Sequence, residues 1–131
     1  MPRTVETSIR VRYAETDAQG VVYHSNYLIY FEVARGAFLH AHDVAYADLE
    51  AAGTFAVVVE ARARYAAPAR YDDVLTVSAT LSEVRNRSFT FHYAVRRGET
   101  LVAEGQTAHV CVDRAGKPVR LPPELATLGT D

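Results

Sequence analysis

The feature that most constrains the fold of this 131-residue chain is the apolar stretch from Tyr27 to His42. Its apolar residues cover most of the circumference of a helix, and Glu32 and Arg35 are its only acidic or strongly basic side chains. A helix that is apolar almost all round is buried. Ser25 and Asn26, just before it, are both good helix N-caps. The stretch therefore predicts a buried helix of about 16 residues and about 24 Å, which the rest of the chain has to surround.

The rest of the chain mostly alternates between apolar and polar residues, which is typical of half-buried strands. This alternation predicts five strands, at residues 5–13, 55–65, 74–84, 89–95 and 101–112. A short second helix or turn is predicted at 44–52, and a helical turn or tail from Pro122. Short connections, such as a hairpin turn at Arg97-Gly98, favour antiparallel pairing. We therefore expect an α+β fold in one domain, residues 1–131, with an antiparallel five-stranded sheet wrapped around one long buried helix.

Composition excludes several classes of protein. The net charge of −2 lacks the basic excess that is typical of nucleic-acid-binding proteins. The single cysteine allows no intrachain disulfide, the N-terminal residues lack the apolar core of a secretion signal, and no run approaches the roughly 18 apolar residues of a membrane span. We therefore expect a cytoplasmic protein that binds neither nucleic acid nor membrane. A chain of this size has a poor ratio of volume to surface, so self-association is also expected.

Residues 11–27, with the sequence VRYAETDAQGVVYHSNY, closely resemble the opening signature of a known enzyme family. This family is the 4-hydroxybenzoyl-CoA thioesterase-like branch of the hotdog-fold superfamily. The match continues through Tyr30-Phe31-Glu32 to Ala34-Arg35, with a weaker one at residues 67–73. The resemblance implies a hotdog fold and a homodimer or homotetramer with active sites at the dimer interface.

The activity that the resemblance implies is hydrolysis of an acyl-CoA thioester to a free carboxylic acid and coenzyme A. Neither a metal nor a redox cofactor is implied, and coenzyme A is part of the substrate. Some members of the family act instead on acyl groups attached to acyl carrier protein, so this partner stays open. The residues do not tell an aromatic acyl group from a short-chain or medium-chain one.

The resemblance places the catalytic aspartate of the family on Asp17 and its histidine, in members that have one, on His24. Thioester hydrolysis needs a carboxylate beside the carbonyl carbon, either as a nucleophile that forms a mixed anhydride or as a general base on water. The alternative is that Asp17 only caps a turn that Gly20 closes. His24 is a candidate for positioning the water, binding the carbonyl oxygen or orienting Asp17.

The predicted helix start is the second half of the expected site. Free N–H groups and the positive end of the helix dipole attract negative charge there, so donors between Tyr23 and Tyr27 are candidates for binding the oxyanion. The side chains of Tyr23 and Asn26 are further candidates for the catalytic site. The alternative is that they only set the path of the chain into the helix.

Three other groups of residues are weighed in the same way. Candidate coenzyme A phosphate ligands lie between the third and fourth strands, where a plain polar turn is the alternative: Arg85, Asn86, Arg87 and Ser88. Candidate residues of the acyl pocket are Val57, Val58 and Val59, for which the alternative is the core. For Glu32 and Arg35, an internal or interface ion pair is favoured over a second catalytic carboxylate. The histidines and the cysteine show no metal-ligand spacing.

Two other functions remain open from the sequence. The first is a hotdog hydratase or dehydratase, which transfers protons on an acyl thioester and would use His24 with Asp17 or Glu32. The second is a module that binds acyl thioesters without turnover. Release of a free thiol from an acyl-CoA distinguishes the thioesterase from both.

Overall fold

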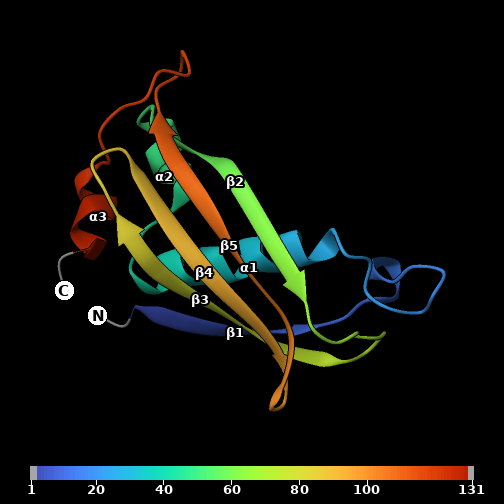
Figure 1. Ribbon diagram of the computed structural model, residues 1–131. Coiled ribbons are helices and arrows are strands. Elements are labelled where there is room, and N and C mark those ends of the chain that lie inside the picture. Colours follow the sequence, from blue (N-terminus) through green and yellow to red (C-terminus); the bar gives the residue numbers. More distant parts are fainter. Residues whose placement is uncertain (1–2, 130–131) are drawn as a thin grey trace.

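The computed structural model describes residues 3–129, and its elements follow the predicted order of one strand, one long helix and four strands (Figure 1). The strands are β1 (Thr4–Arg10), β2 (Phe55–Tyr65), β3 (Val74–Val84), β4 (Ser88–Arg97) and β5 (Thr100–Val112). The helices are α1 (Asn26–Ala41), α2 (Tyr46–Ala51) and α3 (Pro123–Ala126), with short 3-10 turns at Tyr13–Glu15 and Thr127–Gly129. No helix within residues 3–129 is long and apolar enough to cross a membrane.

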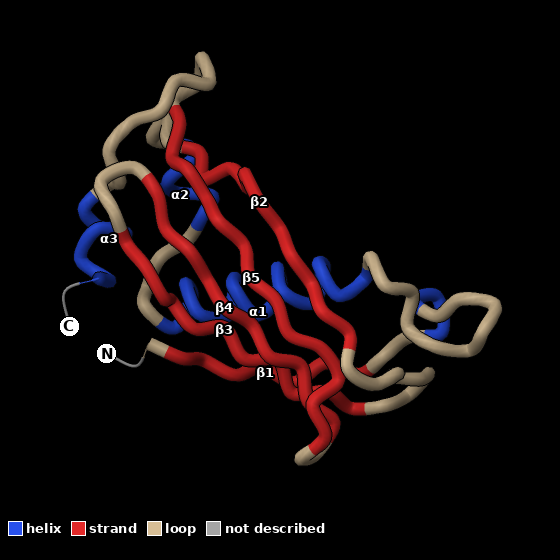
Figure 2. Tube along the Cα trace, viewed as in Figure 1, coloured by secondary structure: helices blue, strands red, loops and turns tan. Residues whose placement is uncertain are grey.

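All strands belong to one antiparallel sheet with the order β1-β3-β4-β5-β2. Figure 2 shows this sheet curling over α1, with β1 at one edge and β2 at the other. The α+β fold expected from the sequence, a five-stranded antiparallel sheet around one long helix, is therefore confirmed.

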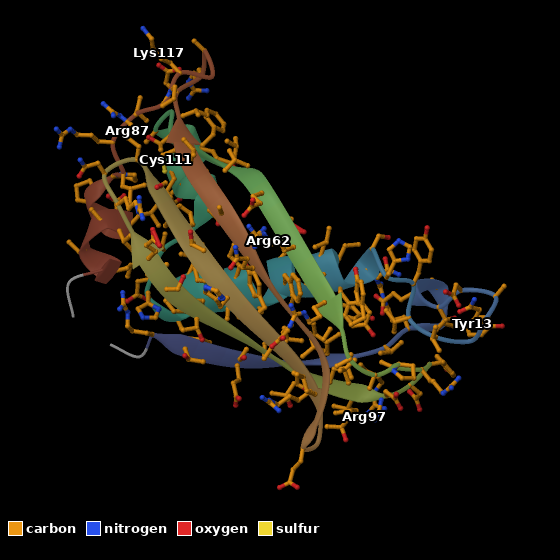
Figure 3. The ribbon with its side chains drawn as sticks, viewed as in Figure 1. Tyr13, Arg62, Arg87, Arg97, Cys111 and Lys117 are labelled. Atoms are coloured by element: carbon orange, nitrogen blue, oxygen red, sulfur yellow. The ribbon has the colours of Figure 1, made fainter. Side chains whose placement is uncertain are left out.

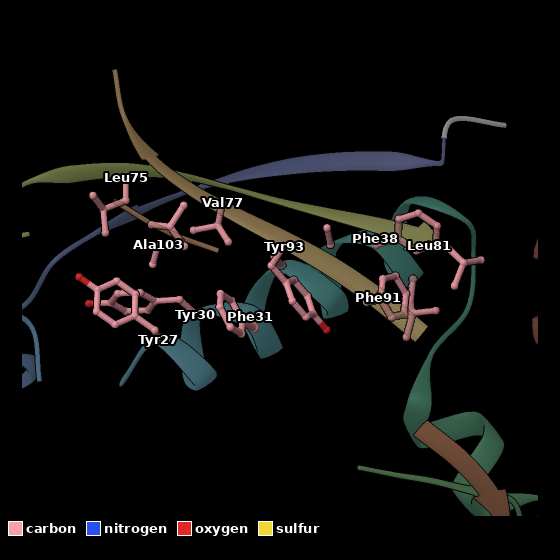
Figure 4. Packing of buried hydrophobic residues seen from close by; sticks show 14 of the residues in the cluster. Tyr27, Tyr30, Phe31, Phe38, Leu75, Val77, Leu81, Phe91, Tyr93 and Ala103 are labelled. Atoms are coloured by element: carbon pink, nitrogen blue, oxygen red, sulfur yellow. The ribbon is translucent and has the colours of Figure 1, made fainter. Parts of the chain in front are cut away.

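The core lies between the inner face of the sheet and the sheet-facing side of α1 (Figure 4). The ring of Phe31 on α1 stacks on Tyr93 of β4, with ring centroids 4.5 Å apart and planes only 4° from parallel. Gly105 of β5 makes room for this ring, because a Cβ there would lie 2.6 Å from the edge of Phe31 and collide with the backbone oxygen of Arg62. The absence of a side chain at Gly105 therefore allows the helix to lie this close to the sheet.

The long helix α1 was predicted to be buried all round, but in a single chain one side of it is exposed. Leu28, Ile29 and Val33 of α1 are 39%, 51% and 46% exposed. Val57, Val58 and Val59, on the edge strand β2, are 39%, 50% and 60% exposed, so the alternative that they belong to the core is wrong for one chain. We call Leu28, Ile29, Val33 and Val58 the apolar face, because Val58 pairs with inward-facing His109 and lines a groove with Leu28 and Ile29, whereas Val57 pairs with Val110 on the other side of the sheet. A helix that is apolar all round has the same sequence pattern whether the side away from the sheet is covered by its own chain or by another molecule.

β1 is shorter than predicted. It stops at Arg10, and Tyr13, the last residue of the predicted strand, is 77% exposed in a 3-10 turn. The reason is that Glu15 accepts a hydrogen bond from the backbone N–H of Arg12 at 2.9 Å, which favours a turn over an extended strand.

A buried chain of polar side chains crosses the core beneath α1. Arg35 Nη1 donates to the Tyr93 hydroxyl at 3.1 Å, Tyr93 and Thr107 hydroxyls lie 2.6 Å apart, and Thr107 Oγ1 lies 2.7 Å from His109 Nε2. Glu32 is exposed, and the ion pairs found within residues 3–129 do not include it with Arg35. The expected internal Glu32–Arg35 pair is therefore wrong for one chain, because the guanidinium turns into the core toward Tyr93.

Buried His109 gives the protein an acid-sensitive core. Burial, together with the charge of Arg35, lowers the pKa of His109 from 6.5 to about 3. Because the unfolded chain takes up this proton at a higher pH than the folded chain, stability is lost as the pH falls from about 6.5 toward about 3, by up to about 1.4 kcal/mol per pH unit. Urea unfolding between pH 7 and pH 4 should show this slope reduced in His109→Phe. An equal slope in both proteins would contradict the assignment.

Candidate active site

Asp17 lies in a tight loop between β1 and α1 that projects beyond the end of the sheet (Figure 1). Its backbone oxygen accepts the N–H of Gly20 at 2.9 Å, and its Oδ1 accepts the N–H of Gln19 at 2.9 Å. Gly20 has a φ of +81°, a conformation that favours glycine. The expected turn is thus formed, and the loop holds the half-buried Asp17 in one place. Capping this turn uses one carboxylate oxygen, which does not exclude a chemical role for the other.

A cavity of about 370 Å³ brings Asp17 together with His24. Its wall also includes Val22, Tyr27 and Tyr65. The ring centroids of the two tyrosines lie 5.4 Å apart. Two of the four predicted catalytic residues therefore lie at one hollow beside the start of α1. Tyr23 and Asn26 are not among the residues that line it.

The start of α1 offers two free donors. The N–H groups of Asn26, Tyr27 and Leu28 donate to carbonyl oxygens three residues earlier, and that of Tyr23 donates to the Glu15 carbonyl at 2.9 Å. Among the hydrogen bonds of residues 3–129, none uses the backbone N–H of His24 or of Ser25. These two groups lie at the positive end of a 16-residue helix, and His24, though not Ser25, lines the cavity.

The predicted N-cap residues behave differently from expectation. Ser25 directly precedes α1, but its side chain makes no capping hydrogen bond. Asn26 is the first helical residue, and its side-chain amide donates to the backbone oxygen of Glu15 at 2.8 Å. The side chain of Asn26 therefore fixes the Asp17 loop to the helix and does not occupy the amides of His24 and Ser25.

Tyr65 is a cavity residue that the sequence did not single out. It is the last residue of β2, and its hydroxyl donates to the backbone oxygen of His24 at 3.2 Å. The centroid of its ring lies 6.3 Å from that of His24 and 5.4 Å from that of Tyr27. A large aromatic residue that ends an alternating strand just before Pro68 was the one available signal, and only the fold shows which loop it contacts.

The predicted phosphate ligands lie far from Asp17 in one chain. Residues 85–87 form the turn between β3 and β4, and the Arg85 N–H donates to the carbonyl of Ser88, the first residue of β4, at 2.8 Å. Figure 3 shows Arg87 and Tyr13, which is close to Asp17 in the sequence, at opposite ends of the molecule. Val57, Val58 and Val59 also lie outside the Asp17 cavity. The structure thus brings neither group to Asp17 within one chain.

The chemistry of the cavity is that of a carboxylate near hydrogen-bond donors. Within the described part of the chain, no three His, Cys, Asp or Glu side chains are arranged to hold a metal ion. Cys111 is buried, and burial raises the pKa of its thiol to about 11, which makes it a poor nucleophile at neutral pH. The groups present at the cavity suit attack on, or base-assisted hydrolysis of, an activated carbonyl.

Comparison with known proteins gives a consistent result. The sequence pattern of the thioesterase-like superfamily matches residues 11–128. The acyl-CoA thioester hydrolase YbgC of Escherichia coli O157:H7 is 37% identical over 119 residues, which cover 89% of each protein. The 1,4-dihydroxy-2-naphthoyl-CoA hydrolase of Synechocystis is 30% identical over 128 residues, 93% of each protein. A solved structure from Aquifex aeolicus is 41% identical with a TM-score of 0.88, and the match covers 92% of this chain and 94% of that one.

Proposed function

The chain belongs to the thioesterase-like superfamily and is an acyl-CoA thioesterase of the hotdog fold, and we propose that Asp17 and the start of α1 carry out the hydrolysis. The observation that carries this proposal is the shared cavity: Asp17 and His24 line it, and the backbone N–H groups of His24 and Ser25 are free. In the reaction, water adds to the acyl carbon, the carbon–sulfur bond breaks, and coenzyme A leaves as a thiol. The products are the carboxylic acid and free coenzyme A.

Two routes for Asp17 fit this geometry. In one, the carboxylate attacks the thioester carbon to give a mixed anhydride, which water then hydrolyses. In the other, the carboxylate takes a proton from the water as that water attacks. In both, negative charge develops on the thioester oxygen, and the N–H groups of His24 and Ser25 stabilise it. The His24 side chain, exposed at the cavity, then has the role of positioning water or substrate.

A second copy of the chain is the occupant that we propose for the apolar face. Val58 on the edge strand β2 and the exposed Leu28 and Ile29 of α1 line one groove, and together they form an apolar surface that a monomer would leave in water. A homodimer formed there would cover the groove between α1 and β2, of which Leu28 and Val58 are part. In that assembly Val58 would line the acyl pocket, whereas Val57, which was predicted to line it too, faces away from α1. Residues 85–88 are too remote within one chain, so phosphate contact by them requires a neighbouring copy.

This interface leads to a direct prediction. Val58→Glu places a charge in the apolar face and should convert the oligomer to monomers, with loss of most of the thioesterase activity. Val74→Glu is the matched control, because Val74 is similarly exposed, at 45%, but lies on β3 outside this face. Sedimentation velocity measures the outcome. A Val58→Glu protein that sediments like the wild type would contradict the proposed interface.

The experiment that tests the function is a thiol-release assay with Ellman's reagent over a panel of aromatic and aliphatic acyl-CoAs. We expect saturable release of coenzyme A from at least one class. Hydration of an enoyl-CoA without thiol release would point to a hydratase. Tight binding of an acyl-CoA without turnover would point to a binding module, and either result would refute the hydrolytic mechanism. Activity only on acyl carrier protein thioesters would keep the mechanism and change the substrate.

A further inference from the structure

We propose that Glu15 is a positioning residue of the active site, which locks the Asp17 loop onto the start of α1. This inference rests on the proposed role of Asp17 and adds to it. Asp17 and the free amides of His24 and Ser25 lie at two ends of the connection between β1 and α1, one in a tight turn and the others just before the helix. Something has to fix the distance between them, because misplacement of a reacting group by about 1 Å can cost about 10²-fold in rate.

The carboxylate of Glu15 makes three hydrogen bonds. Its Oε1 accepts the backbone N–H of Arg12 and the hydroxyl of Tyr30, each at 2.9 Å, and its Oε2 accepts Nε of Arg12 at 2.9 Å. Tyr30 is a buried residue of α1, only 2% exposed. The side chain of Glu15 thus ties the beginning of the Asp17 loop to the first turns of the helix.

The backbone oxygen of Glu15 makes the second connection. It accepts the side-chain amide of Asn26 at 2.8 Å and the backbone N–H of Tyr23 at 2.9 Å. Tyr23 directly precedes His24, whose backbone N–H is a proposed oxyanion donor. One residue therefore holds both the chain that enters α1 and the helix itself, two positions before Asp17.

Glu15 positions the Asp17 loop and does not itself react with the substrate. It does not line the cavity that contains Asp17 and His24. Burial acts to raise the pKa of Glu15, but hydrogen bonds from the Arg12 N–H, the Tyr30 hydroxyl and the Arg12 guanidinium outweigh burial and keep its pKa below the usual value. At neutral pH its charge is therefore retained and is committed to these partners.

The test compares Glu15→Ala, Glu15→Gln and Tyr30→Phe, with Glu99→Ala in the β4–β5 turn as the control. We expect Glu15→Ala to lower kcat by about 10²-fold with KM changed less than about 3-fold, because the reacting groups separate while the substrate pocket persists. Glu15→Gln keeps an oxygen for Tyr30 and the Arg12 N–H and should restore kcat to within about 3-fold of the wild type. Tyr30→Phe, which removes one bond without loss of ring packing, should lower kcat by about 3- to 10-fold.

Hydrogen exchange of residues 16–26, followed by mass spectrometry, is the second readout and needs no substrate. Exchange should become at least 10-fold faster in Glu15→Ala and stay unchanged in Glu99→Ala and Asp17→Asn. Wild-type kcat in Glu15→Ala, or unaltered exchange there, would overturn the inference. If Glu15→Ala does not fold, wild-type kcat and exchange in Tyr30→Phe would overturn it. Absence of thiol release by the wild type would refute the proposed function alone, and the exchange data would still decide the role of Glu15.

Discussion

Replacement of Asp17 by Asn should lower kcat by about 10³-fold and leave the fold and the oligomer intact. An asparagine Oδ1 can still accept the N–H of Gln19, which Asp17 accepts at 2.9 Å, so the turn and the position of residue 17 should persist. A neutral amide neither attacks a thioester carbon nor takes a proton from water. The loss should therefore appear in kcat, with KM changed little. Steady-state thiol release measures kcat and KM, and a circular dichroism melt on the same samples shows whether the fold is intact.

The chain contains a matched control for this substitution. Asp113 also begins an Asp-x-x-Gly turn: its backbone oxygen accepts the Gly116 N–H, its Oδ1 accepts the Ala115 N–H, each at 2.9 Å, and Gly116 has a φ of +83°. Asp113 lies outside the Asp17 cavity. Asp113→Asn should therefore destabilise its turn by about as much as Asp17→Asn destabilises the other turn, but its kcat should equal that of the wild type. Equal kcat values for Asp17→Asn and the wild type would remove Asp17 from the mechanism.

The comparison of the two turns explains what the sequence could and could not predict about the site. Both Asp-x-x-Gly segments predict a turn, because aspartate and glycine are the residues that such a turn needs. The turn alone does not predict chemistry. What separates Asp17 from Asp113 is its surroundings, an adjacent helix start and the cavity wall from β2, and local patterns do not encode the second of these.

The strand β3 was predictable because burial leaves a periodic pattern in its sequence, whereas β2 alternates in sequence although none of its residues is buried in one chain. The alternation in residues 55–65 and 74–84 predicts β2 and β3 to the residue. The limits of β1 were wrong, because a side chain of Glu15 ends that strand by a hydrogen bond that alternation does not reveal. The internal pairing of Arg35 with Glu32 was wrong within one chain for the same kind of reason. Spacing along the helix favours Glu32, but the tertiary fold places Tyr93 within reach of the guanidinium.

The residues that join the halves of the site show the same limit. Glu15 and Tyr65 contact the segment at residues 23–30 from a loop and from the end of β2. The sequence around each residue does not reveal these partners, because each acquires its role from a contact across the fold. The catalytic candidates were accessible to sequence reasoning, whereas the residues that position them required the structure.

Gly105→Ala should destabilise the protein by about 3 kcal/mol or more, the largest stability effect that we expect from a single methyl group. The new Cβ would lie 2.6 Å from the ring of Phe31 and overlap the backbone oxygen of Arg62, which is fixed in the sheet. Because backbone cannot yield, Phe31 would have to move, together with its stacking on Tyr93 and the segment of α1 that carries it. The melting temperature should fall by about 10 °C or more.

Gly36→Ala is the control for Gly105→Ala, because it adds the same methyl group to α1 where nothing lies within 4 Å. There the exchange should raise stability by up to about 1 kcal/mol, since alanine favours a helix over glycine. Comparison of the two variants distinguishes the loss of stability caused by overlap of the new methyl group with its neighbours from the change caused by the helix preference of alanine over glycine. A shift of α1 in Gly105→Ala also displaces the amides of His24 and Ser25 relative to Asp17, so its kcat should fall below that of the wild type at temperatures where the variant is still folded. A Gly105→Ala protein that melts with the wild type would mean that α1 lies farther from β5 than this fold places it.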